Sequence, residues 1–276
     1  MKPSETGNEH YRILIVDDNQ AIHADLRKIL LPEAAGQQDM LEDEEFLFDS
    51  KPVEVARFEI ESAYQGQEGL TMVERAVAEA KRMAEAAKAA GLQHVVWSTL
   101  EDVRQYVPLT DDRMPTLHGK YKVPHFDGKG EADQYFLDAG VPTTFLLASF
   151  YWENFIGFGS GPKKAPDGGY ALTLPIGKAP MAGIASEDIG RCAYGLFKQG
   201  PSAIGQRVGV AGDQLTGDQM AAALTRHLGV PVRYNEIEPA VFRSFGFPGA
   251  DDLGNMFQFY RDFAAVCNDM RDVARS

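Results

Sequence analysis

Two adjacent carboxylates follow the first apolar run of the chain. The run Ile13–Val16 is typical of a buried strand, and Asp17 and Asp18 come directly after it. In open α/β sheets, ligands bind outside the carboxyl ends of the strands, and a helix N-terminus there commonly receives a phosphate. Two unit charges about 4 Å apart interact by roughly 4 kcal/mol at an effective dielectric constant of about 20. This strand end therefore predicts poor binding of a diphosphate unless a cation lies between the two.

A lysine stands near the start of a later predicted helix. Lys129 lies in the stretch "DGKGE", for which Asp127 is a plausible N-cap. The positive end of a helix dipole makes a nearby lysine lose its proton more readily, which suits contact with a cofactor or proton transfer. Without other signals, a solvated surface lysine is the more common outcome. His125, beside Phe126 in "VPHFDGK", could also line a site, although the histidines show no metal-ligand spacing.

The elements that must position these residues alternate between strand and helix. Apolar and polar residues indicate strands over 12–16, within 56–65, and over 94–99 and 143–149, and helices over about 21–31, 68–90 and 127–139. This order predicts an α/β fold with a parallel sheet, right-handed crossovers and helices on both faces. The ligand crevice is expected at the carboxyl ends of the strands.

The second half of the chain has a less regular pattern. It contains short β segments within 169–185, a helix that begins at Ser186, a strand over 206–212, a helix over 216–229, a strand over 231–237 and a helical pattern over 251–275. We expect a smaller C-terminal α+β region on the substrate side of the sheet.

The composition excludes several classes of protein. The 276 residues are 44% hydrophobic and carry a formal net charge of −13, so we expect a globular chain that does not bind nucleic acid or an anionic membrane directly. Two distant cysteines, Cys192 and Cys267, indicate reduced thiols. The leader has no apolar core, and no window approaches the roughly 18 apolar residues of a membrane span. These features predict a cytoplasmic protein.

The first 80 residues or so resemble the front half of a response-regulator receiver domain. The resemblance lies in "YRILIVDDNQAIHADLRKIL" and "FEIESAYQGQEGLTMVERAVAE". In that family an acidic pair, here Asp17 and Asp18, helps to hold Mg²⁺ beside a phosphorylatable Asp at the end of the third strand. Here that strand ends in Ser98 and Thr99, so the acceptor is absent. Two carboxylates alone would hold Mg²⁺ weakly, and phosphotransfer is expected to be lost.

From about residue 82 onward the chain resembles NmrA-like proteins, atypical short-chain dehydrogenases/reductases that bind NADP(H). The most specific segment is "VPHFDGKGEADQYFLDAGVPTTFLLASFYWENF". The resemblance implies that cofactor contacts are made by Lys129, Tyr151, Trp152, Glu153 and Asn154. It also puts Ser98 and Thr99 where catalytic relatives carry a serine that polarises a carbonyl, although a strand-end hydroxyl often satisfies the local backbone instead. Tyr194 and Lys198 have the dehydrogenase YxxxK spacing but come one helix too late, which indicates chance.

The chain departs from the NmrA-like pattern at its first turn. The family's GxxGxxG turn and the arginine for the 2′-phosphate are missing, and "VDDNQAIH" stands in place of the turn. We therefore expect a receiver-like segment over 1–80 that shares one sheet with an NmrA-like region over 81–276. The leading interpretation is a redox-sensing regulator with a weakened or lost NADP(H) site, acting through a protein partner or as a homodimer. The alternatives are an NAD(P)-dependent oxidoreductase with Lys129 as proton relay, and a Mg²⁺-binding receiver remnant.

Overall fold

The structure, a computed structural model, describes residues 11–16, 58–63, 69–156, 160–166 and 168–273. The chain divides into two compact units, residues 1–64 and 65–276. In the first unit, the described residues form two parallel strands, β1 (Tyr11–Val16) and β2 (Phe58–Ala63), as predicted. Asp17, Asp18 and the helix predicted over 21–31 lie outside the described residues.

A four-stranded parallel sheet forms the centre of the second unit. Its order is β12-β9-β4-β3, and the strands are β3 (Val95–Thr99), β4 (Thr143–Leu147), β9 (Arg207–Ala211) and β12 (Arg271–Val273). Every residue of β4 is buried, as expected for an apolar strand in a parallel sheet that is covered on both faces. The parallel pairing of β3 with β4 confirms the α/β prediction.

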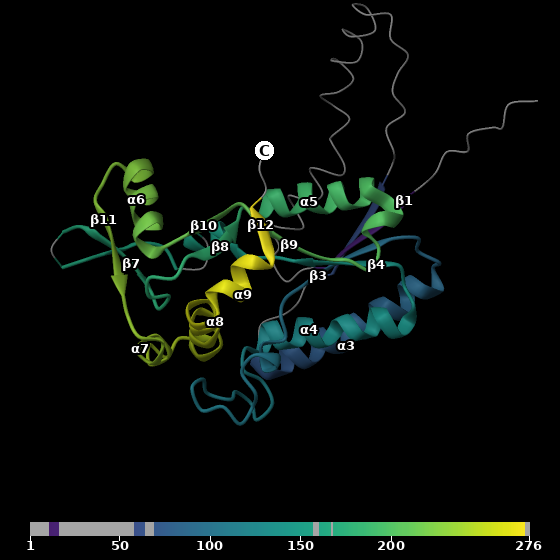
Figure 1. Cartoon of the computed structure of the whole chain (residues 1–276), viewed down its shortest axis with the longest axis horizontal. Coiled ribbons are helices and arrows are strands. Elements are labelled where there is room, and N and C mark those ends of the chain that lie inside the picture. The colour runs from purple at the N-terminus through teal and green to yellow at the C-terminus, as the bar shows by residue number, and fades with distance from the viewer. Residues whose placement is uncertain (1–10, 17–57, 64–68, 157–159, 167, 274–276) are drawn as a thin grey trace, which may run out of the picture. The chain divides into compact units, whose positions relative to one another are not determined.

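Helices cover both faces of this sheet. The helices α3 (Gly69–Ala89) and α4 (Pro124–Ala139) lie side by side on one face, and α5 (Ser186–Gln199) lies on the other (Figure 1). A Cβ atom at Gly128 would lie 2.7 Å from Val73 Cγ1, so the missing side chain lets α4 approach α3 closely. The prediction of a parallel sheet with helices on both faces is confirmed.

Two smaller sheets lie beyond the carboxyl ends of β4 and β9. One has the order β10-β8-β5, with β5 (Phe150–Tyr151), β8 (Met181–Ile184) and β10 (Asp213–Leu215); the other has the order β11-β7-β6, with β6 (Lys163–Lys164), β7 (Tyr170–Leu174) and β11 (Val232–Glu236). The helices of this region are α6 (Gly217–Leu228), α7 (Pro239–Arg243), α8 (Ala250–Asp262) and α9 (Ala264–Asp269), and short 3₁₀ turns span Val103–Gln105, Trp152–Phe155 and Gly200–Ala203.

The end of the chain differs from its predicted structure. The helical pattern over 251–275 accounts for α8 and α9, but the chain then turns into β12, which pairs in parallel with β9. Because the edge of β9 offers backbone partners to Arg271–Val273, and Arg271 is buried there, a strand replaces the last helical turn. The prediction of a helix through this segment is wrong.

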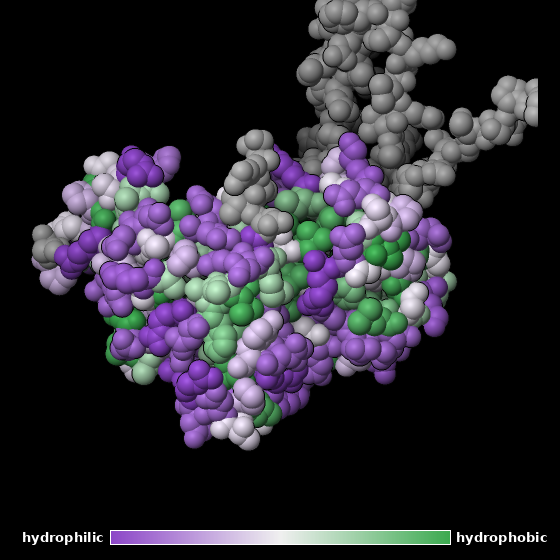
Figure 2. Space-filling model, in the orientation of Figure 1, coloured by the Kyte–Doolittle hydropathy of each residue, from purple (hydrophilic) through white to green (hydrophobic). Residues whose placement is uncertain are grey.

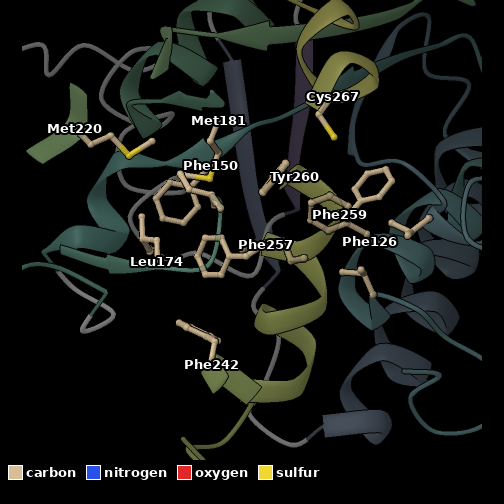
Figure 3. Packing of buried hydrophobic residues seen from close by; sticks show 14 of the residues in the cluster. Phe126, Phe150, Leu174, Met181, Met220, Phe242, Phe257, Phe259, Tyr260 and Cys267 are labelled. Atoms are coloured by element: carbon tan, nitrogen blue, oxygen red, sulfur yellow. The ribbon is translucent and has the colours of Figure 1, made fainter. Parts of the chain in front are cut away.

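Aromatic side chains fill the core between the smaller sheets and α8. Phe257 of α8 lies 6.0 Å from Phe150 and 5.3 Å from Phe242, centroid to centroid. Phe259, two residues on, has its ring 6.4 Å from that of Phe126 on α4 (Figure 3). Opposite sides of α8 therefore contact the smaller sheets and α4, and this helix fixes the first turn of α4 against the C-terminal region.

The surface of the second unit is predominantly polar. On the face shown in Figure 2, hydrophilic residues predominate, and hydrophobic residues gather near the middle, where Figure 1 shows α9 and β12. Among the described residues, none of the helices has the length and apolar character that a bilayer span requires.

Candidate functional site

The end of β3 lies against the second turn of α4. Thr99, the last residue of β3, is fully buried, and its Oγ1 donates at 3.3 Å to the carbonyl oxygen of Lys129 and at 3.4 Å to that of Leu100. The structure thus brings together two of the predicted site residues, through a backbone carbonyl. The hydroxyl of Thr99 therefore bonds to nearby backbone, which is the alternative that the sequence had offered to a role in polarising a substrate carbonyl. Ser98 and Lys129 are half-buried.

The start of α4 differs from the sequence prediction. Val123 is the N-cap, and Pro124 occupies the first turn, where its missing N–H costs nothing. Asp127 is therefore not the N-cap, and Lys129 lies in the second turn rather than the first. Proline at a helix start is a known signal, but the side chain of Asp127 made the later start equally compatible with the sequence.

Asp127 instead organises the loop before α4 from inside the helix. Its Oδ2 accepts hydrogen bonds from the backbone N–H groups of Lys122 at 2.7 Å and Val123 at 3.1 Å, and its Oδ1 accepts from that of Val103 at 2.8 Å. Burial raises the pKa of Asp127 to about 6, against the opposing effect of these donors. The carboxyl group thereby joins two backbone segments, one at Val103 and one at Lys122 and Val123, at the base of the site.

A second buried carboxyl lies deeper on α4. Asp133 accepts from the indole N–H of Trp97 at 2.9 Å and forms an ion pair with Arg207 of β9. Burial raises its pKa. These contacts hold α4 on the sheet and leave Asp133 a structural residue.

The segment after β4 uses two of its predicted cofactor contacts for packing. Glu153 Oε1 accepts a hydrogen bond at 3.0 Å from the backbone N–H of Ser186, the first residue of α5. An anion there is stabilised by the helix dipole. The helix begins at Ser186, as predicted, but its N-cap is Ala185, and the side chain of Glu153 supplies the acceptor for the first turn. Tyr151 pairs with Ile184 of β8.

Trp152 packs directly on a glycine of β8. A Cβ atom at Gly183 would lie 2.3 to 2.7 Å from three carbons of the indole ring, so only glycine leaves room for the ring. The ring also stacks on Phe155, with centroids 6.0 Å apart. Trp152 therefore packs β8 against the turn that follows β5. Asn154, in the same turn, is half-buried.

We expect Gly183→Ala to lower the free energy of unfolding by about 1–3 kcal/mol, because the added methyl group must displace the indole ring. Urea denaturation measures this loss. The matched control is Gly195→Ala on α5, where no atom lies within 4 Å of the added Cβ. This change should stabilise the chain by about 0.5–1 kcal/mol through helix propensity. Equal effects of the two substitutions would contradict the packing account.

A fully buried ion pair lies at the carboxyl ends of β3 and β4. Arg271 donates at 2.9 Å from Nη2 to Oε2 of Glu101, and from Nη1 to Oε1, while the two side chains are 0% and 1% exposed. Its remaining N–H groups donate to the carbonyl oxygens of Ala148 and Cys267 at 2.7 to 2.9 Å. Every donor of the guanidinium is therefore used. Sequence reasoning missed this pair, because 170 positions separate its members and no spacing signal joins them.

Two polar atoms in the segment after β4 have no hydrogen-bond partner among the residues that the structure describes. These are Ser149 Oγ, which follows β4, and Glu153 Oε2, and both are buried. A buried polar atom without a partner is costly, which favours a ligand or water as its partner. They are the strongest structural indication of a binding site next to β4.

Other candidate sites receive less support. Within the described ranges, no group of three or more His, Cys, Asp or Glu side chains could hold a metal ion. The predicted Mg²⁺ ligands Asp17 and Asp18 lie outside those ranges, so that site stays a prediction. Tyr194 and Lys198 lie on the exposed side of α5, with the ammonium nitrogen 5.5 Å from the ring centroid. Their position on the outside of the helix agrees with a chance YxxxK spacing.

Comparison with known proteins identifies the family. A model of the NmrA-like family matches residues 59–273, most of the chain. The chain belongs to the NmrA-like family. The family match includes residues 59–80, which the sequence had assigned to a receiver-like half, and begins upstream of the expected boundary near residue 82. The comparisons give no support for the receiver-like half.

Two curated fungal regulators are similar to this NmrA-like chain. The nitrogen metabolite repression protein nmr of Neurospora crassa is 29% identical over 160 residues, which cover 55% of this chain and 30% of that protein. The nitrogen metabolite repression protein nmrA of Emericella nidulans is 29% identical over 171 residues, which cover 58% of this chain and 45% of that protein. The match thus spans less than half the length of either relative.

Solved structures share the fold. The crystal structure of NmrA, a negative transcriptional regulator, has a TM-score of 0.64 at 20% identity and covers 93% of this chain and 84% of that chain. The structure of NmrA in complex with NADP has a TM-score of 0.63 at 19% identity, with 94% and 84% covered. An NADPH-dependent quinone oxidoreductase from Escherichia coli has a TM-score of 0.56 at 18% identity, with 89% and 87% covered. The chain therefore shares the Rossmann-like fold of these proteins.

Proposed function

We propose that this NmrA-like chain is a regulatory protein that binds NAD(P)(H) with a weakened diphosphate site and senses the redox state of the nucleotide. The observation that supports this most is the family match over 59–273, which includes β3, β4 and α4, while the first strand runs directly into two carboxylates. These observations support a chain that keeps residues for the nicotinamide half of the nucleotide and carries the wrong charge for its phosphates.

The residues at the carboxyl ends of β3 and β4 fit the nicotinamide half of the nucleotide. Ser149 Oγ and Glu153 Oε2 are buried polar atoms without protein partners among the described residues. The carboxamide and ribose hydroxyls offer donors and acceptors for such atoms. Lys129, one helix away, would hold a ribose hydroxyl. When bound, the nicotinamide ring gives or accepts a hydride, and the chain would read that change through these contacts.

The first strand of the sequence runs into charges that oppose those of the nucleotide's phosphates. Asp17 and Asp18 stand where NmrA-like proteins carry glycines, and at an effective dielectric constant of about 20 each contact with a phosphate at 4 Å costs roughly 4 kcal/mol. Mg²⁺ between them would offset this cost, because it commonly joins carboxylates to phosphates. We therefore expect Mg²⁺ to increase the affinity for NADPH.

A protein is the partner that best fits the regulatory role. NmrA itself is a negative transcriptional regulator, and the two fungal relatives are named for nitrogen metabolite repression. The present chain has a net charge of −13, which disfavours direct contact with DNA. We propose that it acts on a protein partner or as a homodimer.

Titration with NADPH and NADH, with and without Mg²⁺, tests this function. Isothermal calorimetry should detect binding that strengthens at least tenfold when Mg²⁺ is added, with different affinities for the oxidised and reduced nucleotides. Micromolar binding that is independent of Mg²⁺ would contradict the role given to Asp17 and Asp18. No binding under any condition would overturn the proposal as a whole.

We expect Lys129→Met to weaken NADPH binding about tenfold or more, because a charge-assisted hydrogen bond contributes about 1.5–3 kcal/mol. The same titration measures this change. Lys198→Met on the exposed side of α5 is the matched control and should leave the affinity unchanged. Equal affinities of the two variants would remove Lys129 from the site.

An NAD(P)-dependent oxidoreductase is the second candidate. The specific observation in its favour is that Lys129 lies in the turn of α4 that contacts the end of β3, where an acid–base group could reach a bound substrate. Substrate-dependent oxidation of NADPH that is lost in Lys129→Met would favour the enzyme over the regulator.

A further inference from the structure

The first turn of α4 presents a histidine that is paired with a carboxylate of α8. His125 Nδ1 lies 2.7 Å from Oδ2 of Asp252, and the two side chains are 31% and 26% exposed. The other oxygen of Asp252, Oδ1, is buried and has no hydrogen-bond partner among the described residues. A buried oxygen without a partner is costly, which favours a ligand or water beside it.

This pair lies at the ligand-binding edge of the sheet. Lys129, one turn after His125 on α4, receives a hydrogen bond from Thr99 at the carboxyl end of β3. His125 therefore lies one turn beyond the strand end, in the direction where ligands bind in open α/β sheets. Residues four apart on a helix share a face, so His125 and Lys129 are neighbours there.

The position of Asp252 is fixed by the contacts of α8. One turn later on α8, fully buried Asn255 donates at 2.6 Å to the carbonyl oxygen of Lys122 and at 2.9 Å to that of Pro115. These bonds hold α8 against the loop that leads into α4. Asp252 and His125 are thus preorganised by buried backbone contacts and need no rearrangement to meet.

A carboxylate at Nδ1 determines which imidazole nitrogen transfers protons. It accepts the Nδ1–H hydrogen bond and stabilises the protonated ring, so that Nε2 becomes the nitrogen that gives or takes a proton. The partly exposed ring can exchange that proton with solvent after each turnover. The pair therefore has the arrangement of a general acid and its positioning residue.

We propose that His125, positioned by Asp252, is the proton donor for reduction of a carbonyl compound by the bound reduced nicotinamide. In this step the carbonyl carbon gains a C–H bond from the hydride, and the π electron pair moves to oxygen. The Nε2–H bond of protonated His125 breaks and its proton forms the O–H bond, leaving neutral imidazole, oxidised nicotinamide and an alcohol. The proposal rests on the proposed binding of NAD(P)(H), which is measured separately in its test.

Single-turnover reduction of 4-nitrobenzaldehyde by NADPH tests the proposal. We expect His125→Asn to slow hydride transfer about 100-fold, the usual size of a general-acid effect, while the dissociation constant for NADPH changes less than threefold. His227→Asn, at the exposed end of α6, is the control and should leave the rate unchanged. A fivefold or smaller effect of His125→Asn would overturn the proposal.

The two proposals fail in different ways. If the unaltered chain binds NADPH but does not reduce the aldehyde, the proton-donor proposal is wrong and the binding function stands. If it does not bind NADPH, the proposed function is wrong as well.

A spectroscopic measurement tests Asp252 without any nucleotide. Imidazole ¹⁵N shifts of the full chain should show the Nδ1–H tautomer of neutral His125, and Asp252→Ala should shift the ring toward the Nε2–H tautomer. Asp252→Asn, which keeps an oxygen acceptor, should retain the first tautomer and lose only part of the rate. A predominant Nε2–H tautomer in the unaltered chain would contradict the role of Asp252.

Discussion

Arg271→Met should lower the free energy of unfolding by about 3–5 kcal/mol, the largest effect expected of any side chain described above. The substitution leaves the carboxylate of Glu101, which is 1% exposed, without its counter-charge in the interior. It also leaves the carbonyl oxygens of Ala148 and Cys267 without their donors. Urea denaturation followed by far-UV circular dichroism measures the loss.

The double variant Arg271→Met/Glu101→Gln separates the charge from the packing. Because removal of the second charge relieves the unpaired carboxylate, we expect the double variant to be more stable than Arg271→Met alone. Arg191→Met on exposed α5 is the control, since its ion pairs with Glu187 and Asp188 face solvent and should contribute less than about 1 kcal/mol. A loss below about 1 kcal/mol for Arg271→Met would show that the pair is not buried as described.

The loss should be concentrated at one edge of the sheet. Arg271 is the first residue of β12, which pairs with β9. In Arg271→Met, amide hydrogen exchange at Gly209 and Ala211 of β9 should accelerate more than exchange in β4. Uniform acceleration would indicate global destabilisation instead.

Asp127→Asn should lower the free energy of unfolding by at least about 2 kcal/mol at pH 7. The amide has a single acceptor oxygen, so it cannot accept from Lys122 and Val123 on one side and from Val103 on the other. Buried N–H groups without acceptors cost about 1–3 kcal/mol each. Asp138→Asn, on the exposed end of the same helix, is the control and should change stability by less than about 0.5 kcal/mol.

The contribution of Asp127 should also depend on pH. Its folded-state pKa of about 6 lies above the ordinary value of 3.8, so folding favours the protonated form. This stabilisation is fully present below about pH 3.8 and is lost as the pH rises through 6. Between pH 7.5 and pH 5, the stability difference between the unaltered chain and Asp127→Asn should grow by on the order of 1 kcal/mol. A difference that shrinks as the pH falls would show that the three N–H donors outweigh burial.

Periodicity in the sequence was sufficient for the elements of the α/β core. The apolar spacing of residues 68–90 predicted α3, and the apolar runs over 94–99 and 143–149 predicted β3 and β4, which pair in parallel. These signals are local, because side chains three, four or two positions apart share a face of one helix or strand. The sequence also predicted that residues 151–154 contact a cofactor. It did not show which of their side-chain atoms the packing of the chain would leave available for that contact.

Long-range contacts decided the rest. Glu153 lies at the N-terminus of α5, Trp152 packs on Gly183, and Thr99 bonds to the backbone of Lys129, so packing uses side chains that the sequence had offered to a cofactor. Each of these contacts joins segments that are tens of residues apart.

The sequence by itself determined the family pattern from about residue 82 onward, the acidic charge and the order of strands and helices in the α/β core, since all of these depend on residue type and local spacing. Only the tertiary structure decided that the last segment is a strand, that Arg271 meets Glu101 and that His125 meets Asp252. The physical reason is that burial and pairing across 62 to 170 positions depend on how separate elements pack, and no local periodicity encodes that distance.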